Sequence, residues 1–278
     1  MMSLDFCILR RAFFAYLSPS DKVCFVLILS WLLLMIAVPI FYWFFGDVIF
    51  RFLVPLALFL QFFATVSAVL LRWHLYSVLI VFCWVAGVAW LFEFFGSHFG
   101  FPFGGYDYTK YLQPKIFGVP LLIPLAWFMM LAPSWVIANL VVPKNKVYTL
   151  AAYVFISALA VTAWDLFLDP QMVAWGFWIW EKPAPQSLVY FGIPWSNFAG
   201  WMLTAIIATT LARPWRYELQ PMPLLTIYGI AWILESIGLA IFWGQPGPAL
   251  VGFVTMGSLL WWAVSRYLKT KALVEHCS

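Results

Sequence analysis

The stretch from Thr162 to Trp180 reads T-A-W-D-L-F-L-D-P-Q-M-V-A-W-G-F-W-I-W. It places Asp165 and Asp169 at the end of an apolar helix and follows them with a run of tryptophans. Carboxyl groups within a membrane span are costly, and they usually mark functional positions. The stretch therefore predicts an acidic pocket with aromatic walls.

The composition around this stretch is typical of an integral membrane protein. The 278 residues are 65% hydrophobic and 9% charged, and the mean hydropathy is +0.95. A soluble globular domain does not have this composition. Aromatic residues make up 21%, and the 18 tryptophans exceed what interfacial belts require, which favours a ring-lined cavity. We expect an all-α, polytopic transmembrane helical bundle that forms a single domain over residues 1–278.

Hydropathy predicts about eight spans, since roughly 20 apolar residues cross the hydrocarbon core. The boundary near Arg72 and His74 is the weakest, because the runs on either side nearly merge. The expected spans are Val23–Phe45, Phe50–Leu71, Tyr76–Phe95, Val119–Val142, Tyr148–Leu168, Tyr190–Ala212, Leu224–Trp243 and Ala249–Tyr267.

Basic residues orient the spans. With an even number of spans both termini lie on one side, and Arg10, Arg11, Lys144, Lys146, Arg213 and Lys269 are among the many basic residues there. The other side holds Arg51, Lys110, Lys115 and Lys182. The positive-inside rule then predicts a cell-membrane protein whose N-terminal segment (1–22) and tail (268–278) are both cytoplasmic.

In this orientation the acidic residues gather near the outer leaflet. Glu93 ends the third span, Asp165 and Asp169 end the fifth, and Glu235 lies in the outer half of the seventh. Asp165 and Asp169 are four apart and share a helix face. Two such carboxyls out of bulk water do not both ionise easily, which leaves a proton donor beside a carboxylate that stabilises positive charge. The alternative for Asp169 is a chain turn before Pro170.

Two short echoes are compatible with an internal repeat. Ala-Trp-x-x-Glu-x-x-Gly occurs at Ala89–Gly96 and again at Ala231–Gly238. Phe-Gly-Val-Pro at Phe117, with Trp127 beyond it, resembles Phe-Gly-Ile-Pro at Phe191, with Trp201 at the same spacing. Trp90 and Trp232, three residues before Glu93 and Glu235, are expected to flank a cationic intermediate. The alternative is that each Glu only bonds a neighbouring helix.

The loops between spans add further candidates. Tyr106, Asp107 and Tyr108 follow the Gly104-Gly105 turn and are expected to cap the pocket, or else to anchor the loop at the interface. His98 is expected to act as a hydrogen-bonding partner, and Asn197 to orient a water or to bond across helices.

The sequence lacks the motifs of disulfide, metal, nucleotide and diphosphate sites. Cys7, Cys24, Cys83 and Cys277 have no paired spacing, so neither a disulfide nor a cysteine metal site is predicted. No P-loop, GxGxxG, DDxxD-type cluster or His-rich box occurs, and the basic residues at helix ends do not indicate nucleic acid. We expect no metal and no cofactor.

The motifs resemble those of the CruF-type carotenoid hydratases, membrane proteins of carotenoid biosynthesis. The similarity spans about Trp90 to Trp243, and is carried by W-D-L-F-L-D-P-Q-M-V-A-W-G-F-W-I-W-E, by Y-F-G-I-P-W-S-N-F-x-G-W, by E-F-F-G-x-x-x-G-F-P-F-G-x-Y-x-Y and by F-G-V-P-L-x-I-P-L-x-W. The resemblance implies addition of water to the terminal double bond of a ψ-end, giving a tertiary alcohol. Its substrates would be acyclic or monocyclic carotenoids of the lycopene, γ-carotene or bacterioruberin-precursor type.

This chemistry needs a desolvated acid, rings facing a cation and one water. We expect Asp165 or Glu93 as the proton donor, Asp169 and Glu235 as charge-stabilising or water-activating groups, and Trp90, Trp164, Trp175 and Trp232 as pocket walls. The expected partners are the lipophilic carotenoid, the bilayer and other enzymes of the pathway. The alternatives are a lycopene-type cyclase that uses the same protonation and a non-enzymatic isoprenoid carrier.

Overall fold

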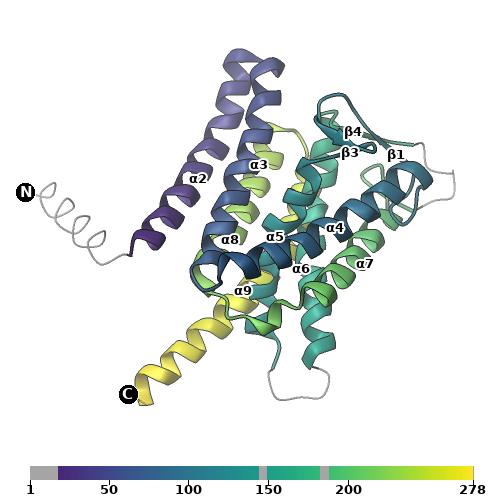
Figure 1. Ribbon diagram of the computed structural model, residues 1–278. Helices are drawn as coiled ribbons and strands as arrows, with labels where there is room; N and C mark the ends of the chain where they lie inside the picture. Colours follow the sequence, from purple (N-terminus) through teal and green to yellow (C-terminus); the bar gives the residue numbers. More distant parts are fainter. Residues whose placement is uncertain (1–17, 144–148, 182–187, 278) are drawn as a thin grey trace, which may run out of the picture.

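The protein is a bundle of long α-helices with a few short strands at one end (Figure 1). The computed structural model describes residues 18–143, 149–181 and 188–277, without the side chains of the last four. In chain order the helices of the described part are α2 (Pro19–Phe45), α3 (Asp47–Leu70), α4 (Leu75–Phe99), α5 (Leu122–Val141), α6 (Thr149–Ala174), α7 (Trp195–Ala212), the short 3₁₀ turn η1 (Pro214–Arg216), α8 (Pro221–Ile237), the π-helical turn η2 (Gly238–Phe242) and α9 (Pro246–Cys277).

The predicted all-α polytopic bundle is confirmed. Among the described residues, seven helices are long and apolar enough to cross a membrane, and α7 is the one expected span outside that set. The weak boundary near Arg72 is a true break, because α3 ends at Leu70 and α4 begins at Leu75. Beyond Tyr267, where we expected a tail, α9 continues as helix to Cys277. The N-terminal segment to residue 17 and Lys144, Lys146 and Lys182 of the charge argument lie outside the described residues.

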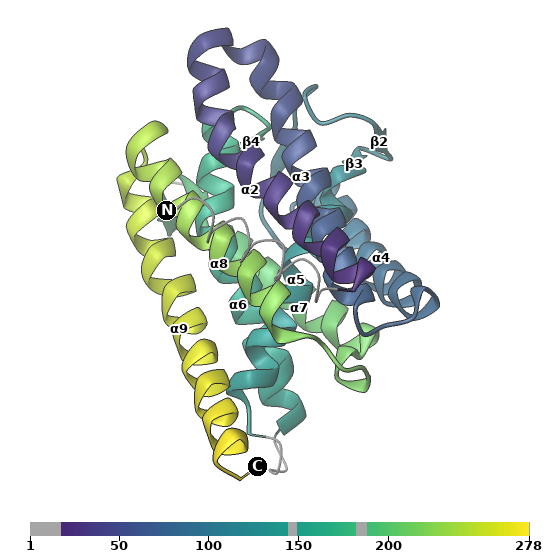
Figure 2. The same ribbon diagram turned by 90° about the vertical axis from the view of Figure 1, so that its left-hand side faces the viewer.

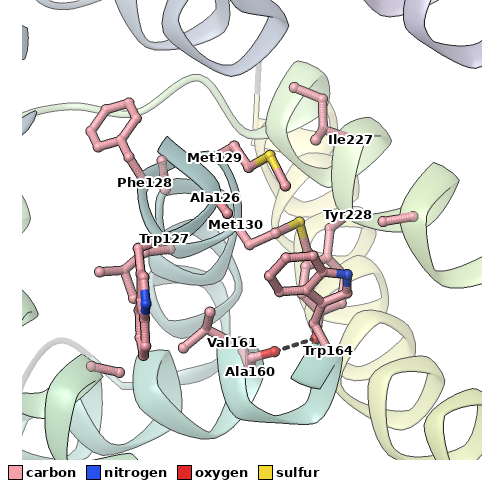
Figure 3. Packing of buried hydrophobic residues seen from close by; sticks show 14 of the residues in the cluster. Ala126, Trp127, Phe128, Met129, Met130, Ala160, Val161, Trp164, Ile227 and Tyr228 are labelled. Atoms are coloured by element: carbon pink, nitrogen blue, oxygen red, sulfur yellow. Dashed lines mark hydrogen bonds between the residues drawn. The ribbon is translucent and has the colours of Figure 1, made fainter. Parts of the chain in front are cut away.

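Helix α5 forms the centre of the bundle. Of its apolar window 83% is buried, against 17% for α2 at the periphery. It packs against α3, α4, α6, α8 and α9. Figure 3 shows Met129 and Met130 of α5 directed toward α8, while Trp127 lies on another side of α5. The hydroxyl of Tyr228 on α8 donates to the carbonyl of Ala160 on α6 at 2.9 Å, which ties these helices together.

The strands form three two-stranded pairs at the end of the bundle away from the C-terminus (Figures 1 and 2). β1 (Tyr106–Tyr108) pairs with β4 (Trp178–Trp180), antiparallel, with Tyr106 opposite Trp180 and Tyr108 opposite Trp178. The other pairs are the hairpins β2 (Lys115–Ile116) with β3 (Val119–Pro120) and β5 (Val189–Tyr190) with β6 (Ile193–Pro194).

The repeated Phe-Gly-x-Pro motif forms two hairpins of the same kind. Phe117 and Gly118 turn the first, Phe191 and Gly192 the second, and all four have positive φ between 47° and 89°. Positive φ at both central residues is the geometry of tight two-residue hairpins. Each hairpin leads into a helix, α5 or α7. The order helix, strand, hairpin, helix therefore occurs twice, over α4 to α5 and over α6 to α7.

Candidate active site

A small cavity of about 30 Å³ lies between α4, α5, α6 and α7, beside the β1–β4 pair. That volume is about the space of one water molecule. Its walls are Glu93, Phe103, Tyr106, Tyr108, Ile123, Ala126, Trp127, Leu168, Asp169, Trp178, Trp180, Asn197 and Trp201. We call it the acid pocket. Two of the expected acids, Glu93 and Asp169, line it together.

Glu93 is buried in α4 and surrounded by hydrogen-bond donors. One carboxylate oxygen accepts from the Tyr106 hydroxyl and from the Tyr108 hydroxyl, the latter at 2.5 Å. The other accepts from the Trp127 indole at 3.2 Å. Both tyrosines are brought here by the turn that follows α4, and the turn fits because Gly96 leaves room: a Cβ there would meet the Phe103 ring at 2.5 Å.

Asp169 on α6 is held in the same manner by rings from its own following strand. Its Oδ1 accepts from the indoles of Trp178 at 2.7 Å and Trp180 at 2.9 Å. Its Oδ2 accepts from the Asn197 amide at 2.6 Å. Since an indole N–H can only donate, these contacts suit an ionised carboxylate.

Asp165 is close to this cluster but does not line the acid pocket. The same Asn197 amide donates to its Oδ2 at 2.7 Å, so one amide bridges two carboxyl groups one helical turn apart. Its Oδ1 is buried and has no hydrogen-bond partner. Asp165 is therefore linked to the pocket through Asn197.

Both copies of the repeated unit, α4 to α5 and α6 to α7, contribute equivalent parts to the acid pocket. Glu93 precedes β1 and takes two hydroxyl donors from it, and Asp169 precedes β4 and takes two indole donors from it. The two strands pair with each other. Trp127 and Trp201, the tryptophans at matching distance from the Phe-Gly turns, stack at 4.1 Å between centroids. Both halves of the repeat thus contribute one acid to one pocket.

The tyrosines of β1 lie outside the helical spans and keep their protons. Burial, and next the charge of Glu93, raise the pKa of Tyr106 well above its usual value of 10.0, and the same causes act on Tyr108. Both hydroxyls therefore remain donors at any pH near neutrality.

A second, larger cavity of about 300 Å³ adjoins the acid pocket. It lies between α2, α3, α5, α6 and α8, and we call it the apolar cavity. Its walls are mostly aliphatic and aromatic and include Trp31, Trp164, Trp175, Trp178 and Trp243. Its volume is that of a small-molecule site. Trp164 and Trp175, expected as walls, do line it.

The apolar cavity contains Glu235, which the structure separates from the other acids. Its Oε2 accepts from the Gln171 amide at 2.7 Å, and the Gln171 oxygen is buried without a partner. Gln171 lies two residues after Asp169, so the end of α6 directs one side chain to each cavity. Of the four expected acids, Glu93 and Asp169 therefore line one pocket, Glu235 lines another cavity, and Asp165 lines neither.

The two cavities share part of their walls. Ile123, Ala126, Leu168 and Trp178 line both of them. The indole N–H of Trp178 donates to Asp169 of the acid pocket, while the Trp178 side chain also lines the apolar cavity. A molecule at this shared wall would lie within reach of groups from both sides.

Several expected site residues lie elsewhere. Trp90 donates to the Ile116 carbonyl and Trp232 to the Phe253 carbonyl, and neither lines the two cavities. Three residues are 300° of helix, so each ring falls to one side of its glutamate. Asp107 is exposed, since side chains alternate along β1. His98 is exposed, and its Nδ1 contacts the Phe94 carbonyl and the Ser97 hydroxyl.

Other site residues were not expected from the sequence. Trp178 and Trp180 stand in the opening stretch as unassigned tryptophans, and Trp127 and Trp201 were noted only for their spacing. Gln171, Gln61 and Trp31 gave no signal. Within the described ranges, no group of three or more potential metal-ligating side chains could hold an ion.

Comparison with known proteins agrees with the sequence motifs. A family model described as "Carotenoid biosynthesis protein" matches residues 52–260. The chain is similar to the bisanhydrobacterioruberin hydratase of Haloarcula japonica, with 29% identity over 177 residues. The match covers 61% of this chain and 58% of that relative, less than two thirds of its length. No solved structure matches.

Proposed function

The chain belongs to the carotenoid biosynthesis protein family, and we propose that it is a carotenoid hydratase. It would add water to the terminal double bond of a ψ-end on an acyclic or monocyclic carotenoid, giving a tertiary alcohol. The observation that carries this proposal is the pair of adjoining cavities: one suits an apolar chain, and the other suits one water beside two acids. Alkene and water are the two reactants of a hydration.

The polyene would come from the bilayer through the side of the bundle. Ile36 and Ile40 of α2, and Ile237 and Phe242 of α8 and η2, line the apolar cavity and are 41% to 55% exposed. They mark a mouth on the face where α2 and α8 lie side by side (Figure 2). In a membrane protein an exposed apolar mouth faces lipid, which is where the carotenoid dissolves.

The acid pocket would supply and deprotonate the water. We assign the proton-accepting role to Glu93, because Tyr106 and Tyr108 can turn their hydroxyls to suit either state of the carboxyl. Asp169, held by two indoles, stays a carboxylate and balances the positive charge of the cation. Asp165 positions Asn197, which orients Asp169. Two rings of the apolar cavity would face the cation: Trp178 from the shared wall and Trp164 from the apolar cavity alone.

The chain would be a single membrane domain in the cell membrane, with both termini cytoplasmic, and would act without a cofactor. Its partners would be the lipophilic carotenoid and, for supply and removal of the pigment, other enzymes of the pathway.

Expression in a host that makes ψ-ended carotenoids tests the proposal. Cells grown in water labelled with heavy oxygen should accumulate a pigment heavier by one water, with the label in its hydroxyl. A ring-closed pigment of unchanged mass would instead support a cyclase. Unaltered pigment across several ψ-ended substrates, with the protein present in the membrane, would refute both and leave a carrier.

A further inference from the structure

The two cavities differ in which acids they can bring to a double bond. The acid pocket has room for about one water and cannot also hold the end of an isoprenoid chain. The reacting alkene must therefore lie in the apolar cavity, against the shared wall. A proton donor has to reach the carbon that it protonates, so it must face that cavity.

Among the described side chains that line the apolar cavity, Glu235 alone carries a carboxyl group. Asp165 lines neither cavity, and Glu93 and Asp169 line only the acid pocket. Glu235 is 8% exposed and its surroundings are aliphatic and aromatic. An isolated charge is costly there, so such a carboxyl is suited to carrying a proton.

Gln171, the hydrogen-bond partner of Glu235, is also suited to an acid that changes its protonation state. The Gln171 side chain is 2% exposed, contacts Glu235 at 2.7 Å and has its second polar atom unpartnered. An amide can donate to a carboxylate or accept from a carboxylic acid, so it supports Glu235 before and after proton transfer. The indoles that hold Asp169 can only donate, so they favour its carboxylate form.

We propose that Glu235 is the acid that protonates the alkene and that Gln171 positions it. This rests on the proposed hydratase function and assigns its first step. The carboxylic proton of Glu235 adds to the less substituted alkene carbon, and the π electrons form the new C–H bond. The tertiary carbon becomes a cation, and water from the acid pocket forms the C–O bond and gives its proton to Glu93. Proton exchange with solvent returns Glu235 to the acid and Glu93 to the carboxylate.

The acid, Glu235, and the base, Glu93, would then lie on opposite sides of one substrate. Proton and water reach adjacent carbons from different cavities, so no single carboxyl has to perform both steps. The same geometry disfavours ring closure, because the water waits beside the carbon that becomes the cation.

The decisive variant is Glu235→Gln, measured in purified protein for both turnover and carotenoid binding. The amide keeps the size and the contact with Gln171 but has no acidic proton. We expect turnover to fall about 10²-fold or more, with unchanged quenching of tryptophan fluorescence by the bound carotenoid. The matched control is Glu218→Gln, an exposed acid outside both cavities, which should leave turnover and binding unchanged.

A second variant, Glu235→Asp, keeps the acid but withdraws it by one methylene. A misplacement of about 1 Å costs up to about 10²-fold, so its turnover should lie between those of the wild type and Glu235→Gln. Wild-type turnover in Glu235→Gln, or turnover in Glu235→Asp no higher than in Glu235→Gln, would overturn the assignment, while hydration by the wild type would preserve the proposed function. No hydration by the wild type would instead refute the function itself.

Discussion

The apolar cavity and the acid pocket share a wall but are otherwise opposites. The first is large, lined by tryptophans and aliphatic side chains, and carries one carboxyl–amide pair. The second has room for about one water, and each of its two acids accepts three hydrogen bonds from ring substituents or an amide. Under the proposed function, this difference places binding of the carotenoid and handling of water in separate cavities.

The two regions also come from different parts of the chain. The acid pocket is built entirely from the repeated unit, α4 to α7, which lies within the family match. The apolar cavity needs α2, α3 and α8 as additional walls, and α2 lies before the matched range. The packing of these helices against α5 and α6 therefore creates the apolar cavity.

The largest expected effect is the loss of the base in the acid pocket. Glu93→Gln should lower turnover about 10²- to 10⁴-fold, the usual contribution of a general acid or base. Binding of the carotenoid should persist, because Glu93 does not line the apolar cavity. Turnover and fluorescence quenching on the same sample measure both. Wild-type turnover would remove the acid pocket from the mechanism.

Thickening the shared wall should separate the two reactants. Ala126 lines both cavities, and Ala126→Val adds bulk between alkene and water. We expect turnover to fall about 10- to 100-fold, since a misplacement of about 1 Å has effects of that size. Overpacking costs about 1–3 kcal/mol, so thermal unfolding should be measured in parallel. Unaltered turnover in a folded protein would contradict passage across this wall.

Sequence reasoning found the acids, tyrosines and amide of the acid pocket but not its tryptophans, and it found little of the apolar cavity. Asp165, Asp169 and Glu93 stood out because acids in apolar spans are rare, and Asn197 and the two tyrosines followed from nearby turns. The repeated Ala-Trp-x-x-Glu-x-x-Gly motif suggested equivalent surroundings for Glu93 and Glu235, but the structures that follow the two motifs differ. Gly96 makes room for Phe103, whereas Gly238 begins a π-helical turn and meets only Trp243.

The apolar cavity could not be predicted because it is a consequence of how helices pack. Trp31, Gln61 and Gln171 come from three helices, and nothing in their spacing indicates that they surround one space. Trp90 and Trp232 were expected there from helical spacing alone, which gives a face of a helix but not its neighbour. Local hydropathy, in contrast, located the long helices, although it predicted eight spans where seven described helices are long and apolar enough to cross a membrane.

A smaller effect is expected for one donor to the acid. Tyr108→Phe removes a hydroxyl that bonds Glu93 at 2.5 Å and keeps the ring. Hydrogen bonds to charged groups contribute about 1.5–3 kcal/mol, so turnover should fall roughly tenfold or more. Tyr228→Phe is the matched control: it loses a bond to the Ala160 carbonyl. It should lower unfolding stability by about 1 kcal/mol and leave turnover unchanged.

The smallest effect is expected at the mouth of the apolar cavity. Ile237 lines the mouth, and Ile237→Trp should slow access of the carotenoid, raising KM a few-fold with little change in kcat. The neighbouring Ile241 is 70% exposed and lines neither cavity, so Ile241→Trp is the control. An equal rise in KM for both variants would point to a general effect of lipid-facing tryptophan.

The most direct test of the division between the two cavities is carotenoid binding and hydration measured together on Asp169→Asn. Asp169 lines the acid pocket and not the apolar cavity. The account predicts that hydration falls about 10²-fold or more, as when a charge-stabilising group is removed, while the carotenoid binds as tightly as before. Loss of binding in step with hydration, in a variant that remains folded, would contradict it.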